Sequence, residues 1–318
     1  MKHIKLNLIG LTTAVLLAAG FFLFSSFSTD EKVNTYNFPE TYKITIPKIP
    51  AQIDFCGEKV PLDNFDVFER LDRELTSNTY WHSNMLTSFK NSGRWFPVIE
   101  PILKKNGIPA DFKYLAIIES NLTNAVSPKG AVGFWQFIES TAVKYNLEVN
   151  DQVDERYNVE KSTEAACKYL KDAYNKFGSW TLAAASYNMG MSGVSNQLSR
   201  QRVDNYFNLF LNEETSRYIF RTLAVKEIMS NPAKYGFGVN PEEFYQPIPT
   251  KEVQVTSSIP DLISYAETLG VNYKILKMLN PWLRDSKLTL SKKDWYTVKI
   301  PEEGVYKIYT KEDLIPKN

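Results

Sequence analysis

The sequence predicts a mainly α-helical protein that closes with a small βααβ unit. From about residue 64 to residue 229, apolar residues recur at helical spacing in one short segment after another. Over residues 251–302 the pattern changes, and strand-like segments flank two short helical ones. An apolar stretch at the N-terminus precedes both regions. These three observations divide the chain into a leader, a large helical domain and a small second domain.

The N-terminal stretch has the charge pattern of an export signal. Lys2 and Lys5 precede an uncharged stretch over residues 6–29, and an Asp-Glu pair follows it. Positive charge before and acidic charge after an apolar stretch indicate that the rest of the chain is exported to the periplasm or cell envelope. Two outcomes stay open for residues 1–29. They are either a signal peptide cleaved after Ser28, or a membrane anchor, since the stretch approaches the ~20 residues that span a bilayer.

The elements after this leader follow in a regular order. Residues 30–62 are rich in proline and in residues that favour extended backbone, which predicts a surface tether. Residues 63–235 are expected to form the helical domain, residues 236–250 a proline-rich linker, and residues 303–318 a tail. Helices are expected near 64–75, 80–89, 96–105, 111–120, 141–145, 162–177, 181–187 and 213–230. In the second domain, strands are expected at 253–255 and 295–300, and helices at 259–269 and 273–279.

The composition is that of a globular protein without a polyanionic partner. The chain has 318 residues, 43% of them hydrophobic, and a formal net charge of +1. A sizeable core is therefore expected, and nucleic acid is not expected as a partner. Two cysteines, Cys56 and Cys167, are too few for a disulfide scaffold, and whether they form one bridge stays open. Cys167 is expected to be a small core residue.

One carboxylate stands out as a candidate catalytic acid. Glu119 follows the apolar run Leu115-Ala116-Ile117-Ile118 at the end of an expected helix. If that helix is buried, desolvation raises the pKa of the Glu119 carboxyl, as a general acid for glycosidic-bond cleavage requires. Taken alone, a helical Glu is more often a solvated surface charge.

Three further segments strengthen this interpretation. Residues 127–137 place two glycines among small residues before a Trp-Gln pair, and the Gln136 amide suits an N-acetyl group. A helix of small residues then delivers Tyr187 and Asn188 to its end. Finally, Tyr218 in the first turns of a long helix could reach a carboxylate across a cleft. In isolation, Trp135 and Tyr218 would be interpreted as core residues.

These four segments, in this order, resemble the soluble lytic transglycosylase (SLT) family of the lysozyme-like superfamily. The matching residues are Glu119-Ser120, Ser127 to Gln136, Tyr187-Asn188 with Gly190, and Glu214-Thr215 with Tyr218. The context at 107–109, 154–156 and 177–180 most resembles the membrane-bound lytic murein transglycosylase D branch. The resemblance covers residues 55–235 and implies a lysozyme-like helical fold.

The resemblance also implies a role for each matched position. Glu119 corresponds to the catalytic acid/base, and Tyr218 to a tyrosine that orients it. The positions that correspond to cleft residues, which contact the sugar or support the acid, are Ser127, Gln136, Tyr187 and Asn188. The spacing from Glu119 to Ser127 is one residue shorter than the usual pattern, which leaves the contact made by Ser127 open.

The motifs supply one obvious catalytic carboxylate, whereas ordinary glycoside hydrolases need two. The acidic residues Asp151, Asp154, Glu155, Glu160 and Glu164 lie in a polar stretch and are expected to be solvated or to cap helices. With one carboxylate, the nucleophile must come from the substrate, and muramic acid offers its own C6 hydroxyl. The sequence therefore predicts a lytic transglycosylase that cleaves the MurNAc–GlcNAc β-1,4 bond of peptidoglycan and leaves 1,6-anhydroMurNAc ends.

Two alternatives to this function remain. The chain could be a goose-type lysozyme-like hydrolase that adds water, or a non-catalytic peptidoglycan-binding protein. In each case the partner is the peptidoglycan glycan strand. No cofactor is expected, and the only histidines, His3 and His82, are too few for a metal site.

The second domain resembles a LysM module, a βααβ fold that binds N-acetylglucosamine chains. The residues that carry the resemblance include Leu269-Gly270-Val271, Leu279-Asn280-Pro281 and Val298-Lys299-Ile300-Pro301. The usual Gly-Asp after the first strand is absent, and Thr256-Ser257 stands there instead. The resemblance implies the fold, while sugar binding by this module stays open.

Overall fold

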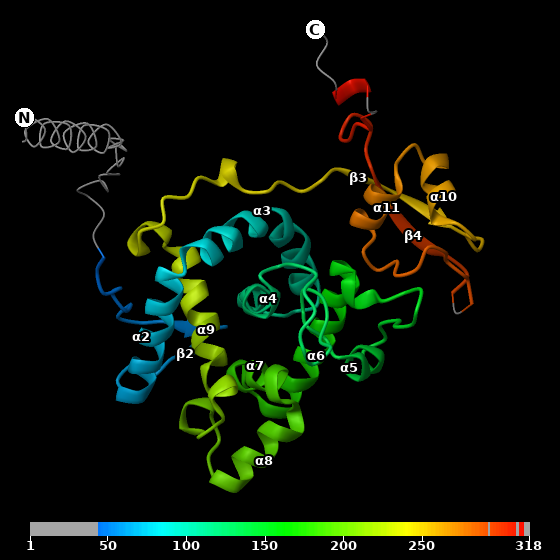
Figure 1. The fold of residues 1–318 in the computed structure, drawn as a ribbon. Coiled ribbons are helices and arrows are strands. Elements are labelled where there is room, and N and C mark those ends of the chain that lie inside the picture. Colours follow the sequence, from blue (N-terminus) through cyan, green and yellow to red (C-terminus); the bar gives the residue numbers. More distant parts are fainter. Residues whose placement is uncertain (1–43, 292, 310–311, 315–318) are drawn as a thin grey trace, which may run out of the picture. The chain divides into compact units, whose positions relative to one another are not determined.

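The structure of the protein is a computed structural model that describes residues 44–291, 293–309 and 312–314 (Figure 1). The expected signal peptide or anchor, residues 1–29, lies outside the described residues, as do residues 30–43 of the expected tether. The chain divides into two units, Met1–Thr45 and Ile46–Asn318, and the fold described below belongs to the second. Within the described residues, none of the helices has the length and apolarity needed to cross a membrane.

The described chain is mainly helical and ends in a two-stranded module, as predicted. The elements are β1 (Asp54–Phe55), β2 (Glu58–Lys59), α2 (Phe65–Tyr80), α3 (His82–Lys105), η1 (Ala110–Phe112), α4 (Lys113–Ser120), α5 (Glu139–Lys144), η2 (Glu155–Tyr157), α6 (Val159–Phe177), α7 (Trp180–Met189), α8 (Met191–Gln201), η3 (Tyr206–Asn208), α9 (Glu213–Ser230), η4 (Pro232–Tyr235), η5 (Pro241–Glu243), β3 (Thr250–Val255), α10 (Leu262–Thr268), α11 (Tyr273–Leu279), β4 (Tyr296–Pro301) and η6 (Glu312–Leu314).

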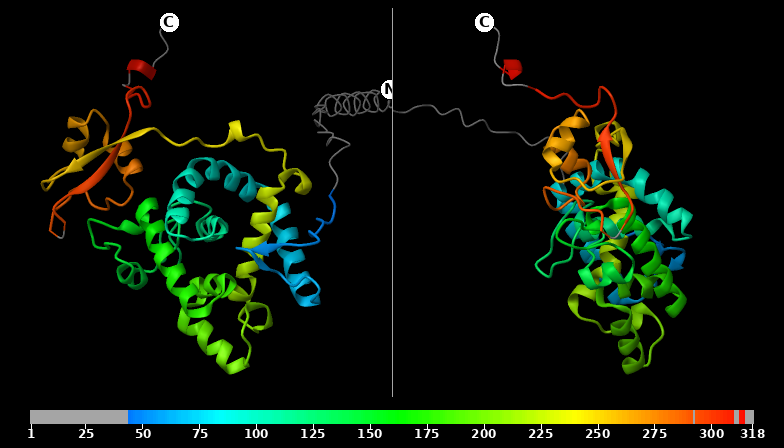
Figure 2. Two further views of the ribbon diagram at one scale, coloured as in Figure 1. Left: turned by 180° about the vertical axis from the view of Figure 1, so that it is seen from behind. Right: turned by 90° about the vertical axis from the view of Figure 1, so that its right-hand side faces the viewer.

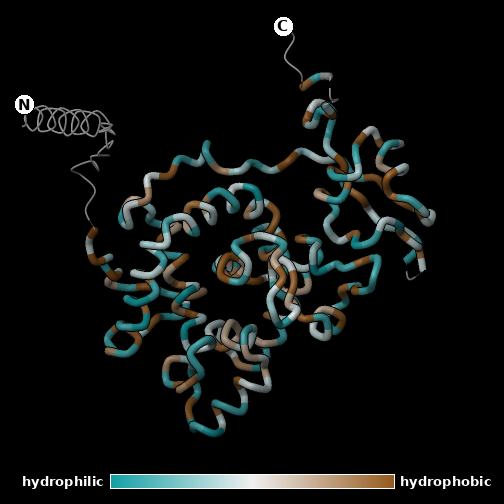
Figure 3. Tube along the Cα trace, in the orientation of Figure 1, coloured by the Kyte–Doolittle hydropathy of each residue, from teal (hydrophilic) through white to brown (hydrophobic). Residues whose placement is uncertain are grey.

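The short helix α4 occupies the middle of the helical domain. It packs against α3 and α9, while α7 also packs against α9 and α6 packs against α3 and α7. In Figure 1 this helix is seen end-on within the other helices, and Figure 3 colours much of it as hydrophobic. Leu115, Ala116 and Ile117 are buried in the core. The apolar run of the sequence is therefore what places the end of α4 inside the domain.

Helix α3 differs from the two short helices expected over 80–89 and 96–105. It is one helix from His82 to Lys105, although Pro97 and Pro101 lie inside it. Proline removes a backbone donor and disfavours a helix interior, yet both prolines lie within one of the two expected helices, 96–105. Tertiary packing overrides that preference here, because Ile99 and Leu103 on the same helix are fully buried. Helix α8, which follows Gly190, was not among the expected helices.

The segment before α2 is not wholly a surface tether. Asp54–Phe55 and Glu58–Lys59 form a small antiparallel hairpin. Phe55 is fully buried and packs edge-on against Phe112, with ring centroids 5.4 Å apart. The described part of the expected tether thus contributes to the core of the helical domain. Cys56 in its turn and Cys167 in α6 are both free thiols, and Cys167 is buried as predicted.

The expected linker at 236–250 lies along α3. The amide of Tyr245 donates to the carbonyl of Lys90, and the Arg94 side chain donates to the carbonyl of Gln246. A β-carbon added to Gly93 would approach that of Phe244 to 2.6 Å, so the segment packs directly on the helix. Both views in Figure 2 show this segment leading from α9 to β3.

The C-terminal domain has the predicted βααβ order. β3 and β4 pair antiparallel, with Val253 opposite Val298, and α10 and α11 pack on each other, with α11 also packing on β4. The hydrophobic cluster of this domain contains Leu262, Leu276 and Val298. It also contains residues of the helical domain, namely Val132, Val153 and Tyr157.

Candidate active site

Glu119 lies in the last turn of α4, where the helix is about to end. The helix terminates at Asn121, which adopts the left-handed conformation with φ of 53°. The Glu119 side chain is partly enclosed and keeps some surface open, while its neighbour Ser120 is buried. The Tyr218 hydroxyl, from α9, donates a hydrogen bond to the Glu119 carboxylate. The acid and the tyrosine predicted to orient it are therefore in direct contact.

Some neighbours of Glu119 raise the pKa of its carboxyl and others lower it. Burial raises the pKa of the Glu119 carboxyl above its ordinary value. The hydrogen bond from Tyr218 and the charge of Arg221 oppose this rise, while the charge of Glu214 adds to it. The net direction is upward, so the carboxyl holds its proton at higher pH than an exposed Glu.

Helix α9 presents three of these groups on one face. Glu214, Tyr218 and Arg221 are spaced by four and three residues, which places them one above another on a helix. The Arg221 guanidinium donates to the carbonyl of Ile118 at 3.0 Å, at the end of α4. Tyr218 itself is only 2% exposed. This face of α9 therefore fixes the position of the acid-bearing turn.

Tyr187 at the end of α7 also lies close to the acid. Its hydroxyl donates to the carbonyl of Trp135 at 2.8 Å. Burial raises the pKa of the Tyr187 phenol, and the negative charge of Glu119 raises it further. Its ring packs against those of Trp135, Phe137 and Tyr169. Tyr187 therefore stays neutral and holds its hydroxyl in place beside Glu119.

Asn188 joins the end of α7 to α9. Its amide oxygen accepts a hydrogen bond from the Thr215 hydroxyl at 2.7 Å. Its amide nitrogen donates to the Glu214 carboxylate at 3.2 Å. Lys129, in the segment that follows α4, approaches the same carboxylate to 3.8 Å. Glu214 thus lies between the end of α7 and that segment.

Residues 125–137, here called the glycine loop, follow α4 and fold back on themselves. The Ser127 hydroxyl accepts from the amide of Ala131 at 3.0 Å and so shapes a turn. The Gln136 side-chain amide donates to the carbonyls of Ala125 and Gly133, at 3.0 and 2.8 Å. Both polar side chains therefore hold the loop together, and the Gln136 donors expected for a sugar are engaged within the protein.

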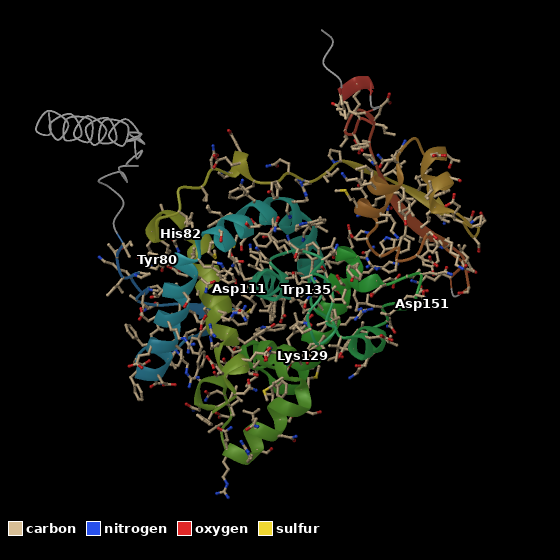
Figure 4. All side chains as sticks on the ribbon, viewed as in Figure 1. Tyr80, His82, Asp111, Lys129, Trp135 and Asp151 are labelled. Atoms are coloured by element: carbon tan, nitrogen blue, oxygen red, sulfur yellow. The ribbon has the colours of Figure 1, made fainter. Side chains whose placement is uncertain are left out.

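Two other residues of the glycine loop anchor it to the domain. Trp135 is fully buried, and its indole donates to the Thr163 hydroxyl at 2.8 Å (Figure 4). It is a core residue, as its sequence alone suggested. The Ser120 hydroxyl donates to the carbonyl of Phe134 at 2.9 Å. Because Ser120 is next to Glu119, this bond ties the loop to the turn that carries the acid.

Gly133 is required where the loop passes the segment before α6. Its φ is +81°, and a β-carbon there would lie 2.1 Å from the carbonyl oxygen of Arg156. A side chain would therefore meet both backbone strain and a direct clash. The glycine therefore permits a close approach of two stretches of protein backbone.

The acidic stretch near α6 departs from the expected solvated state. Asp151 is exposed, but Asp154 and Glu155 are only 6% and 2% exposed. Asp154 accepts from the backbone amide of Arg156, as a capping residue does. Both carboxylates are paired with basic side chains, which is why they can be buried. These residues were expected to be solvated or to cap helices: Asp154 does cap η2, whereas the expectation is wrong for Glu155, which is buried and paired.

Among the predicted site residues, the structure brings Glu119, Tyr218 and Tyr187 together. Asn188 lies one step further out beside Glu214, while Ser127 and Gln136 shape the loop. Sequence reasoning missed Arg221, although its spacing of three from Tyr218 was an available signal. In the described part of the chain, no group of three or more His, Cys, Asp or Glu side chains is placed to hold a metal.

Comparison with known proteins identifies two domains. Residues 96–210 match the family described as the Transglycosylase SLT domain. Residues 251–304 match the soluble lytic transglycosylase C-terminal LysM-like domain. The predicted resemblance to the SLT family and to LysM modules is confirmed by these matches.

Three individual proteins are similar to parts of this chain. Membrane-bound lytic murein transglycosylase D of Escherichia coli K12 is 26% identical over 246 residues, which cover 74% of this chain and 53% of that protein. The chain therefore spans about half the length of this relative. A putative tributyltin chloride resistance protein of Alteromonas sp. is 29% identical over 99 residues, covering 30% of this chain and 48% of that protein. The X-ray structure of an inactive mutant of lytic transglycosylase Slt from Pseudomonas aeruginosa covers 48% of this chain and 26% of that chain, at 20% identity and a TM-score of 0.37.

Proposed function

We propose that this chain, a homologue of membrane-bound lytic murein transglycosylase D with an SLT domain and a LysM-like domain, is a peptidoglycan lytic transglycosylase. The observation that carries the proposal is the Glu119 carboxyl, which is partly enclosed and receives a hydrogen bond from the buried Tyr218 hydroxyl. Its raised pKa keeps a proton available for donation. The substrate is the glycan strand, cleaved at the MurNAc–GlcNAc β-1,4 bond.

In the first step Glu119 gives its proton to the bridging oxygen, and the bond from that oxygen to C1 of MurNAc breaks. The positive charge that develops at C1 is stabilised by the neighbouring N-acetyl group of the sugar. Glu119 is left as a carboxylate, which Tyr218 and Arg221 favour. Groups that stabilise the charged form therefore act after the proton has left.

In the second step the C6 hydroxyl of MurNAc attacks C1 while Glu119 takes its proton. A bond from O6 to C1 forms, the acid is regenerated, and no water is consumed. The product is a 1,6-anhydroMurNAc end. An internal nucleophile held near its target has an effective molarity of up to ~10⁵–10⁸ M, so one carboxyl group suffices.

One observation favours the hydrolase alternative. Glu214 lies close enough to Glu119 for its charge to raise the pKa of the Glu119 carboxyl. A second carboxylate could activate water as a general base, as in inverting glycosidases. Glu214 is, however, engaged by the Asn188 amide and by Lys129, and its surroundings are solvent-exposed. These contacts suit a group that adjusts the pKa of Glu119 better than a catalytic base, which must accept a proton.

Mass spectrometry of digested sacculi tests the proposal. The wild-type protein should release muropeptides with anhydro ends, and Glu119→Gln should release none, because the amide cannot donate the proton. Glu213→Gln is the matched control, since Glu213 is an exposed neighbour on α9 that pairs with Arg73. Reducing ends in the wild-type products would overturn the transglycosylase assignment in favour of hydrolysis.

The Glu214→Gln variant separates the two chemistries further. In a transglycosylase the variant keeps its activity and its anhydro products. Removal of the Glu214 charge lowers the pKa of Glu119, so the alkaline limb of the pH–rate profile moves to lower pH. If Glu214 is instead a catalytic base, the variant loses ~10²–10⁴-fold in rate.

Peptidoglycan as substrate places the protein in the cell envelope. The charge pattern around residues 6–29 supports export, and the relative from E. coli is named as membrane-bound. Periplasmic localisation, and attachment through residues 1–29, are part of this proposal. Fractionation of cells into soluble and membrane fractions, with and without residues 1–29, tests it.

A further inference from the structure

The C-terminal domain is joined to the helical domain through backbone hydrogen bonds. The amide of Asp154 donates to the carbonyl of Trp282 at 2.9 Å, and the amide of Arg284 donates to the carbonyl of Gln152 at 2.8 Å. Between these bonds, Val153 and Leu283 form an antiparallel β-bridge. The segment before α6 thus pairs with the loop that follows α11, near Asp151 in Figure 4.

Buried charges reinforce this pairing. Glu155, 2% exposed, accepts from Lys161 of its own domain and from Lys293 of the C-terminal domain. Lys293 also approaches the Glu148 carboxylate to 3.2 Å, and the Tyr296 hydroxyl donates to that carboxylate at 3.0 Å. A buried carboxylate without partners is strongly unfavourable. The C-terminal domain therefore adds partners to two acidic groups of the helical domain, which Lys161 and Asn150 of that domain also contact.

Apolar contacts extend the same interface to the glycine loop. Val132, in the middle of that loop, is 5% exposed and belongs to the hydrophobic cluster of the C-terminal domain. Tyr157 belongs to it as well, and the Arg284 guanidinium lies 4.0 Å from the centre of its ring. The loop that is bonded to the acid-bearing turn through Ser120 is thus packed on the C-terminal domain.

Arg156 connects the docked segment to the middle and to the C-terminal end of the glycine loop. Its guanidinium is held by the Asp154 carboxylate, with contacts of 2.7 and 2.9 Å. The remaining nitrogen donates to the carbonyls of Gly130 and Phe137, each at 3.2 Å. Since the amide of Asp154 is bonded to Trp282, a chain of contacts runs from the C-terminal domain to the loop beside Glu119.

We propose that the C-terminal domain is a positioning element for the glycine loop, acting through Glu155 and Arg156, in addition to any contact it makes with the glycan. This inference rests on the proposed function, because the loop matters only if glycan is cleaved at Glu119. Arg156 is a positioning residue in this scheme, since it reaches the acid only through the loop and Ser120. Loss of docking loosens the loop and weakens glycan binding while Glu119 and Tyr218 stay in place.

The test is a double-mutant cycle in the full chain, with Glu155→Gln, Lys293→Met and the two combined. The first readout is hydrogen exchange at the loop amides of Val132 and Gly133, which are hydrogen-bonded in the structure. Each single variant should exchange about tenfold faster, as expected when a buried ion pair that supports a local structure is broken. The increase in exchange rate in the double variant should be smaller than the product of the increases in the two single variants, because both changes break the same contact.

The second readout is the cleavage of soluble glycan strands. KM should rise by about tenfold or more while kcat changes little, because the acid and its tyrosine are untouched. Lys293→Arg should restore exchange and KM. Lys251→Met is the matched control, since Lys251 is an exposed lysine on β3 of the same domain. Tyr296→Phe provides a milder change, because it removes only the hydroxyl that bonds Glu148.

The outcomes are distinct. The positioning role is overturned if hydrogen exchange in the loop is unchanged in the folded single variants. It is also overturned if the exchange rates of the two single variants combine multiplicatively in the double variant. If the wild-type protein cleaves no peptidoglycan, the proposed function fails, yet the exchange measurement still decides whether the domain holds the loop. A kcat loss without a KM change would also contradict the inference, since it would place the effect on the acid itself.

Discussion

At the scale of single residues, one carboxyl group is held between opposing influences. Burial raises the pKa of Glu119, whereas Tyr218 and Arg221 act against that rise. An acid that first donates and then recovers a proton needs both states to be accessible. The arrangement stabilises the proton before cleavage and the carboxylate after it.

The raised pKa of Glu119 makes the stability of the protein pH-dependent at this residue. The folded protein holds the proton over a pH range in which the unfolded chain has released it. The free energy of unfolding of the wild type therefore falls as pH rises from the pKa of Glu119 in the unfolded chain to its higher pKa in the folded protein. Above the folded-state pKa, Glu119 causes no further loss of stability. Glu119→Gln does not titrate, so its Tm should exceed that of the wild type by a margin that grows with pH, at ~2–4 °C per kcal/mol. Calorimetry between about pH 4, which is near the ordinary pKa of Glu, and about pH 8 checks this prediction. A Tm difference between the two proteins that stays constant over this range would contradict it.

Tyr218→Phe separates orientation from simple burial. The variant removes the hydrogen bond that lowers the pKa of Glu119, so the alkaline limb of the pH–rate profile should move to higher pH. Its maximum rate should fall by about 10–100-fold, since a hydrogen bond to a charged group is lost. Tyr206→Phe is the control, because the buried Tyr206 hydroxyl bonds backbone groups of α9, among them the carbonyls of Thr215 and Ser216. If both variants shift the profile equally, Tyr218 does not act on the acid.

At the scale of elements, local pattern predicted most of what positions the acid. The apolar run before Glu119 predicted a buried helix end, and the long helix that carries Tyr218 has the bounds expected of it, Glu213–Ser230. Where the sequence misled, tertiary packing overrode local preference. Two helices were expected over 80–89 and 96–105, but α3 runs unbroken from His82 to Lys105. Gln136 stays predicted as a residue that contacts the sugar or supports the acid; in the structure its amide donors close the glycine loop, a contact that no spacing rule reveals.

The glycine loop offers a matched pair of substitutions. Gly133→Ala meets both a positive φ and the Arg156 carbonyl, whereas Gly130→Ala meets a φ of +74° with no atom within 4 Å of its β-carbon. Positive φ alone costs roughly 1–2 kcal/mol, so Gly130→Ala should destabilise by about that amount. Gly133→Ala should lose more stability, and most of its activity, because the loop must move away from Arg156. Denaturant unfolding and glycan cleavage check this, and equal losses in the two variants would show that the clash is relieved without loop movement.

At the scale of the whole molecule, the described helical and C-terminal domains share one interface rather than a loose connection. The sequence predicted both domains and their order, but interpreted the joining segments as solvated. Glu155 looks like a surface residue until Lys293 is brought to it from a position 138 residues away in the chain. Contacts between segments more than a hundred residues apart carry no local signal, which is why this interface could not be predicted from pattern alone.

The shared interface predicts cooperative unfolding. Leu283 is fully buried at the β-bridge with Val153, and the cluster around it contains residues of both domains. The wild-type chain should therefore unfold in one calorimetric transition, with equal calorimetric and van't Hoff enthalpies. Leu283→Asp places an unpaired carboxylate in this interface and should split the transition into two, with the C-terminal domain melting first. Met278→Asp is the control, since Met278 is 60% exposed on α11 of the same domain and should leave a single transition. Two transitions already present in the wild type would mean that the domains are stabilised separately, and that the contacts at Asp154 and Glu155 add little to either.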